Sequence, residues 1–359
     1  MLIARAPVRI SFAGGGTDLP AYFRRHGGAV VSATIDKYVY VILTVHGGSE
    51  LQILSSDYRT FYRHTPGEVL LWEGDLNLPK AILHEFGIHR GVSVFIASEV
   101  PPGTGLGSSS TLTVAAIKAV AAACGLATSK EETARLATRV ELEKMGMPIG
   151  YQDQYAAAFG GLNHIRFHAE GVTVEPMRTP PGVQEKLQRN LLLLFTGASR
   201  ESSQILTRQR DSTERDEGAV LAALHAVRQM ASEMKALLES GNLDGFGLLL
   251  HRGWEQKKQF AAGVTNPQID EAYNLARAHG AIGGKLTGAG GGGFMMLYCA
   301  DGAQEAVTAA LEPCGLQRMD FRFEQGGARV LLNTGLRLGP EEFLPQALQA
   351  ALHWSQAQP

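Results

Sequence analysis

The stretch that decides the fold is PPGTGLGSSSTLTVAAIKAV, residues 101–120. Glycines alternate with other residues, serines follow, and apolar residues then recur at helical spacing. Such glycines allow backbone N–H groups to point into a concavity, and the start of a helix adds N–H groups that have no partner. The stretch therefore predicts an anion-binding loop, although it has no lysine where a Walker loop carries one.

The expected anion-binding loop extends over nine residues. Its serines can cap the helix, donate to phosphate oxygens or ligate Mg²⁺. The G-x-G-x-G spacing and the serine at 108 exclude a dinucleotide fingerprint, and a plain glycine turn with a capping serine is the alternative. The loop residues that we expect to bind a phosphate are Pro102, Gly103, Thr104, Gly105, Leu106, Gly107, Ser108, Ser109 and Ser110.

Composition narrows the class of protein. The chain has 359 residues, a formal net charge of −2 and 45% hydrophobic residues, as expected of a globular protein without a basic surface for nucleic acid. It shows no signal peptide at its start and no apolar stretch long enough to span a bilayer. Its three cysteines are scattered and predict reduced thiols. We expect a cytoplasmic protein that binds neither nucleic acid nor membrane.

Strands and helices alternate irregularly on both sides of the loop. The length suits two domains, and TPPGV at 179–183 is the best candidate linker. We therefore predict an α+β fold with one domain at 1–180 and a second at 184–359. The elements we expect are strands at 7–16, 30–45, 49–57, 92–100 and 190–197, helices at 108–125, 130–146 and 152–160, a hairpin at 162–178, then long helices and a glycine-rich segment before an apolar strand.

Three motifs in order resemble the signatures of the GHMP kinases, the superfamily of galactokinase, homoserine kinase and mevalonate kinase. They are APVRISFAGGGTDLP, PPGTGLGSSS and KLTGAGGGGFMMLY, spread over residues 6–298. Many members have alanine where this chain has Ser110. The resemblance implies ATP and Mg²⁺ as cofactors, a ribosomal-protein-S5-like N-terminal domain and a ferredoxin-like C-terminal domain. The glycines of the third motif, Gly288 and Gly290 to Gly293, lack side chains and would let its backbone pack against the loop; cradling the nucleotide is the alternative.

GGAVVSATIDKY and GYQDQYAAAFGG resemble the sugar-kinase branch that phosphorylates D-glycero-D-manno-heptose 7-phosphate at C1. The resemblance implies an ATP-dependent phosphotransferase with a small sugar phosphate as substrate, and a homodimer is one possible assembly. Fucokinase-like action on a free sugar is the nearest alternative. A non-catalytic regulator that binds sugar and ATP is a second one. An ATP-using decarboxylase is a third, which the polyol-type motifs disfavour.

The resemblance assigns two catalytic residues. Asp153, in GYQDQ, matches the aspartate that orients or deprotonates the acceptor hydroxyl, and Arg9 matches a cation that stabilises the transferred phosphoryl group. The residues alone leave other roles open, because Asp153 could cap the next helix and Arg9 could form a surface ion pair. Together with Mg²⁺, Arg9 would replace the charge that the loop lacks.

For the metal, the resemblance implies Glu141 together with a loop serine, Ser109 or Ser110. One carboxylate is enough, because Mg²⁺ keeps waters and phosphates as its other ligands. Glu143 is a nearby alternative, and both glutamates could instead face solvent on a helix.

For the substrate, Gly16, Thr17 and Asp18 match positions that bind sugar hydroxyls in the family. The same GGTDLP could form an Asx or ST turn instead. If the sugar already carries a phosphate, Arg200 and Lys37 are the expected ligands for it. Lys285, beside the third motif, is a weaker candidate for a phosphate contact.

Overall fold

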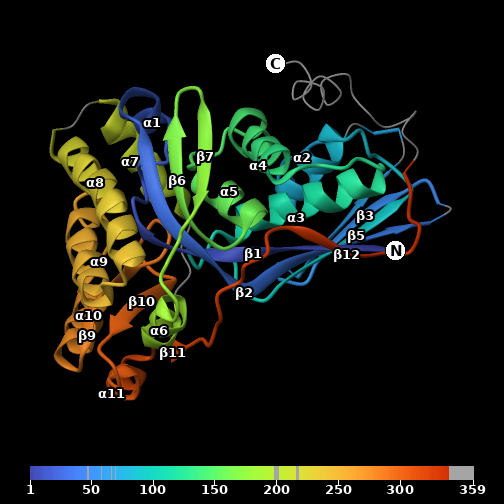
Figure 1. Ribbon diagram of the computed structural model, residues 1–359. Coiled ribbons are helices and arrows are strands. Elements are labelled where there is room, and N and C mark those ends of the chain that lie inside the picture. The colour runs from blue at the N-terminus through green and yellow to red at the C-terminus, as the bar shows by residue number, and fades with distance from the viewer. Residues whose placement is uncertain are drawn as a thin grey trace.

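The computed structural model describes residues 1–338, apart from 47, 58, 66, 69, 198–201 and 216–217. Two sheets organise this part of the chain (Figure 1). None of its helices is both long and apolar enough to cross a bilayer. The three cysteines are free, as predicted.

The first sheet has eight strands built around β1 and β2, whose β-branched and aromatic residues are buried along most of their length. β2 pairs with β6 through its first half and with β5 through its second half. The predicted hairpin is confirmed as β6 and β7. The strands of this sheet from the first half of the chain are β1 (Leu2–Ala13), β2 (Gly28–Val45), β3 (Leu51–Ser55), β4 (Thr60–His64), β5 (Val92–Ser98), β6 (Leu162–His168) and β7 (Gly171–Pro176).

Helices cover one face of this sheet, on the upper side in Figure 1. The central one begins directly after the glycine loop and is buried on almost every side, which explains its run of alanines and valines. The helix expected at 130–146 changes to π-helix after Thr138. The helices of the first half are α1 (Pro20–His26), α2 (Asn77–Glu85), α3 (Ser108–Ala123), α4 (Lys130–Thr138), the π-helix η1 (Arg139–Lys144) and α5 (Gln152–Phe159).

The second sheet has the strand order β11-β8-β10-β9 with all neighbours antiparallel. Numbered along the chain, this is the order 4-1-3-2 of a ferredoxin-like domain, so the predicted fold is confirmed. The strands are β8 (Leu191–Phe195), β9 (Ala281–Leu286), β10 (Phe294–Cys299) and β11 (Gln317–Arg318). The helices are α6 (Val183–Asn190), which the sequence did not predict, α7 (Ser202–Glu214), α8 (Gly218–Ser240), α9 (Leu243–Lys257), α10 (Pro267–Ala278), α11 (Gln304–Leu311) and the 3₁₀ turn η2 (Glu312–Cys314).

The two halves share more structure than the expected boundary at 180–184 implies. The last described strand, β12 (Arg329–Asn333), returns to the first sheet and pairs with β1, as Figure 1 shows at its right. It covers a strand edge that would otherwise leave backbone groups unpaired. α8 and α9 also pack on β1, and their apolar faces join the core of the first sheet. The C-terminal part of the described chain thus contributes a strand to the first sheet, and the domain ranges 1–180 and 184–359 stay a prediction.

Candidate active site

The glycine loop has the backbone geometry of an anion site. Gly103, Gly105 and Gly107 have φ of +74°, +79° and +76°, a region that favours glycine. Gly107 is the N-cap of α3 and no side chain caps this helix, so its first N–H groups are open to a ligand. The loop residues Gly103, Gly105 and Gly107 to Ser110 line a cleft. This local structure fits the phosphates of a nucleotide.

The third motif, KLTGAGGGGFMMLY, packs against this loop and forms hydrogen bonds with it. Phe294 N donates to Thr104 O at 3.2 Å, and the Thr287 hydroxyl donates to the same carbonyl oxygen at 3.1 Å. A Cβ on Gly288 would lie 2.4 Å from Gly105 Cα, and one on Gly293 would lie 2.4 Å from Thr104 O. The missing side chains therefore let two backbones touch, and the predicted packing role of this motif is confirmed.

Arg9 and Asp153, 144 residues apart in the chain, form an ion pair at the mouth of the loop. Arg9 Nε donates to Asp153 Oδ1 at 2.7 Å, and its Nη1 donates to Gly105 O at 2.6 Å. Arg9 is 3% exposed and lies on β1, whereas Asp153 is in the first turn of α5. The guanidinium thus joins the carboxylate to the loop, and both side chains line the cleft.

Glu141 lies directly beneath the start of α3 and is fully buried. Its carboxylate accepts from the Thr113 hydroxyl at 2.6 Å and from the Gln154 amide, which also donates to Ser110 Oγ at 3.3 Å. Burial raises the pKa of Glu141 to about 7 despite these hydrogen bonds. The buried carboxylate has no positive charge beside it among the described residues, so a bound cation would stabilise its ionised form. Ser110 is the loop serine that lies beside Glu141.

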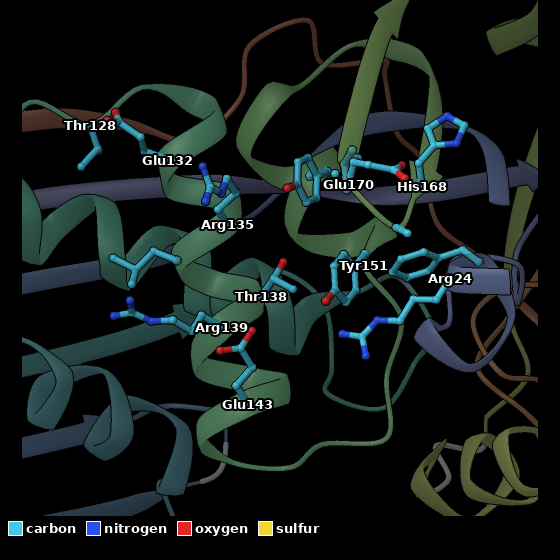
Figure 2. Close-up of a pocket in the computed structure, with 16 residues that line it drawn as sticks. Arg24, Thr128, Glu132, Arg135, Thr138, Arg139, Glu143, Tyr151, His168 and Glu170 are labelled. Atoms are coloured by element: carbon cyan, nitrogen blue, oxygen red, sulfur yellow. The ribbon is translucent and has the colours of Figure 1, made fainter. Parts of the chain in front are cut away.

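Glu143 points the other way, into a second cavity shown in Figure 2. This cavity lies beside α4 and η1 and is bordered by Arg24, Arg139 and Tyr151. Its lining includes no residue of the glycine loop. Of the two glutamates considered for the metal, only Glu141 therefore adjoins the loop. In the part of the chain that the structure describes, no three His, Cys, Asp or Glu residues cluster as a metal site would require, so a cation here would depend on Glu141, serine and phosphate oxygens.

We predict that Glu141→Gln stabilises the protein without Mg²⁺. The carboxyl has an ordinary pKa of 4.5 and a folded-state pKa of about 7, so the folded state binds more protons between these values. The free energy of unfolding therefore falls as pH rises from 4.5 to 7, by on the order of 3 kcal/mol. Glutamine does not titrate, so the stability of the variant does not fall in this way as the pH rises. Urea unfolding should show the variant more stable at pH 8 and nearly equal at pH 4.5, whereas an equal difference at both pH values would contradict the burial argument.

Asp18 also lines the cleft, but Thr17 does not. Asp18 Oδ1 accepts from Gly16 N at 2.9 Å, and burial followed by the charge of Asp153 raises its pKa. The Thr17 hydroxyl is fully buried, donates to Gly14 O at 2.8 Å and accepts from Ala29 N at 3.1 Å. The Thr17 side chain therefore closes the turn, whereas Gly16 and Asp18, the other two predicted sugar contacts, border the cleft.

Thr17→Val should accordingly reduce stability and leave the sugar site intact. Valine keeps the shape but leaves Ala29 N and Gly14 O without this partner, at a cost of about 1–3 kcal/mol. Chemical denaturation would measure the loss. A large rise in KM for the acceptor at unchanged stability would instead restore the role of Thr17 as a substrate ligand.

Of the two residues expected to bind a substrate phosphate, the structure describes only Lys37. Arg200 lies outside the described residues. Lys37 is half-buried on β2, and among the described residues that border the cleft it is absent.

Two lysines that were not among the main predicted site residues line the cleft. Lys257 lies at the end of α9 and is not among the predicted site residues, and Lys285 lies on β9 and is the weaker predicted phosphate contact. Both are nearly buried, and burial lowers the pKa of each. Lys257 sits in the segment WEQKKQF, which has the composition of an exposed helix end, so no local signal marked it.

Comparison with known proteins agrees with this geometry. Residues 77–161 match the GHMP kinases N terminal domain and residues 234–314 match the GHMP kinases C terminal family. The chain is 32% identical over 331 residues to the D-glycero-alpha-D-manno-heptose 7-phosphate kinase of Campylobacter jejuni, covering 90% of this chain and 97% of that protein. The chain belongs to the GHMP kinase family.

Other relatives place it among kinases of small molecules. The crystal structure of a D-glycero-D-manno-heptose 1-phosphate kinase from Bacteroides thetaiotaomicron superposes with a TM-score of 0.76 at 28% identity, covering 93% of this chain and all of that one. The L-fucokinase/L-fucose-1-P guanylyltransferase of Bacteroides fragilis is 27% identical over 83% of this chain but only 34% of its own length. This GHMP kinase is thus a phosphotransferase that uses ATP on a small molecule.

Proposed function

We propose that this GHMP kinase phosphorylates the C1 hydroxyl of D-glycero-D-manno-heptose 7-phosphate with ATP, giving the 1,7-bisphosphate. The observation that carries the proposal is the ion pair of Arg9 and Asp153 at the open start of α3. It brings a carboxylate and a cation to the place where nucleotide phosphates would bind. The 32% identical heptose 7-phosphate kinase supports the choice of sugar.

Each cleft residue then has a role. The N–H groups of the loop and of α3 would hold the nucleotide phosphates. Asp153 would accept the hydrogen bond of the attacking hydroxyl and take its proton, while Arg9 would stabilise the charge on the transferred phosphoryl group. Asp18 and Gly16 would orient the sugar. Little covalent chemistry is needed from the protein, because phosphoryl transfer depends mainly on positioning and electrostatics.

Ser110 and Glu141 would hold Mg²⁺, since they lie together beneath the loop and Glu141 is a buried carboxyl without a cation partner among the described residues. Bound there, the ion supplies positive charge to the phosphate oxygens. Ser109 is exposed at the rim of the cleft and is the less suitable serine. The cytoplasmic location and the homodimer stay predictions.

The test is ADP release from ATP and Mg²⁺ over a panel of acceptors: heptose 7-phosphate, heptose 1-phosphate, free heptose, L-fucose and mevalonate. The names of the two heptose-kinase relatives differ in the position of the phosphate, so NMR of the product should identify the oxygen that is phosphorylated. We expect turnover with heptose 7-phosphate at C1. Turnover with free fucose would favour the fucokinase alternative, which the Bacteroides fragilis relative supports. Tight ATP binding without turnover would favour a regulator.

A further inference from the structure

We propose that Lys285 and Lys257 form the subsite that holds the phosphate already present on the acceptor. This inference rests on the proposed function, in which the sugar arrives phosphorylated. It replaces Lys37, which does not border the cleft, as the cation for that group.

The two lysines reach the cleft from the second sheet. Lys285 is 7% exposed on β9, and Lys257 is 8% exposed where α9 ends. Both border the same cleft as Arg9 and Asp18, and the charges of these two residues act on each lysine. Glu141, by contrast, is influenced by Asp153. Both lysines also border a hollow with Gly14 and Gly15, next to the turn that carries Asp18, whereas Glu141 lies beneath the start of α3.

The ammonium groups of the two lysines have N–H groups without a hydrogen-bond acceptor among the described residues. Lys257 Nζ donates to Leu286 O at 3.2 Å and to Gly288 O, so one of its three N–H groups is left. Lys285 Nζ makes no hydrogen bond or ion pair with the residues that the structure describes. Four donors therefore remain on two lysines that border the same cleft, which suits the oxygens of a phosphate.

The charge balance points to an anion as well. Asp153 is already paired with Arg9, and Asp18 accepts hydrogen bonds from the backbone of Gly16 and Gln152. Burial and the neighbouring cations lower the pKa of Lys285 to about 8 and that of Lys257 well below its ordinary range. Two buried cations that share the single carboxylate of Asp18 are costly, and a phosphate dianion would reduce that cost.

The acceptor is the better source of this phosphate than ATP. The nucleotide already has the N–H groups of α3 and the guanidinium of Arg9, which is hydrogen-bonded to the loop. A sugar whose C1 hydroxyl contacts Asp153 extends away from the loop, and its far end needs a cation that the loop cannot supply. Lys285 and Lys257 also border a smaller hollow beside Gly14 and Gly15, next to the turn that carries Asp18, so a sugar oriented by Asp18 can bring its phosphate to them.

The test compares Lys285→Met with wild-type protein on heptose 7-phosphate and on heptose without the phosphate. We expect kcat/KM for the phosphorylated sugar to fall about 10- to 150-fold, mainly through KM, because a charge-assisted hydrogen bond is lost. The unphosphorylated sugar and the Kd of ATP should be unaffected. Lys258→Met is the matched control, because the neighbouring Lys258 is ion-paired with Glu255 and does not border the cleft.

Three results would overturn the subsite. An equal loss with both sugars would assign Lys285 to the transferred phosphoryl group, a weaker Kd for ATP would assign it to the nucleotide, and no loss would remove it from binding. Inorganic phosphate provides a readout without turnover: with saturating ATP occupying the loop, it should raise the melting temperature of wild type and of Lys258→Met but not of Lys285→Met. If wild type ignores heptose 7-phosphate yet shows this phosphate-dependent shift, the proposed function fails and the anion subsite stands.

Discussion

Asp153→Asn is expected to reduce kcat about 10²- to 10⁴-fold while leaving the Kd of ATP nearly unchanged. Asparagine has almost the same shape and its oxygen can still accept from Arg9 Nε, so the loop keeps its position. What disappears is the negative charge that takes the proton of the acceptor hydroxyl. Single-turnover kinetics with saturating ATP and acceptor would measure the chemical step directly.

Asp244→Asn is the control for this substitution, because Asp244 is exposed in the first turn of α9 and touches nothing in the cleft. The two variants should melt within a few degrees of one another. Nearly normal kcat in Asp153→Asn would exclude Asp153 as the proton acceptor and leave Arg9 and the loop as the catalytic machinery. A large loss of ATP affinity would show instead that the ion pair serves to shape the loop.

The sequence predicted the loop well because its chemistry is local. Left-handed glycines and an uncapped helix start leave a pattern within ten residues, and the resemblance then supplied distant partners such as Arg9 and Asp153. No property of those two residues alone could have joined them, since they are 144 positions apart. Their contact depends on how β1 packs beneath α5.

The lysines show what the sequence could not predict. Lys257 and Lys258 are neighbours of the same type, yet one is buried against the backbone of Leu286 and Gly288 and the other pairs with Glu255 at the surface. Which one turns inward is set by the packing of α9 on β9. Thr17 shows the opposite: its hydroxyl could bind a sugar, but in the structure it donates to Gly14 O within its own turn.

Gly105→Val is expected to lower ATP affinity by at least about 100-fold, because the loop would lose several phosphate donors at once. A Cβ at this position would lie 2.6 Å from Thr287 O, a backbone atom held by β9 and β10. The φ of +79° adds strain of about 1–3 kcal/mol for a β-branched residue. The loop must therefore either leave the third motif or change its backbone conformation, and each alters where its N–H groups point.

Gly302→Val separates these two causes. Gly302 has a φ of +81°, almost that of Gly105, but a Cβ there would meet no atom within 4 Å. It should therefore lose stability through backbone strain while binding ATP normally. Calorimetric titration of ATP into both variants, with circular dichroism to verify folding, gives the comparison. If Gly105→Val binds ATP as tightly as Gly302→Val, the contact between the loop and the third motif does not position the nucleotide, and the phosphates must bind elsewhere in the cleft.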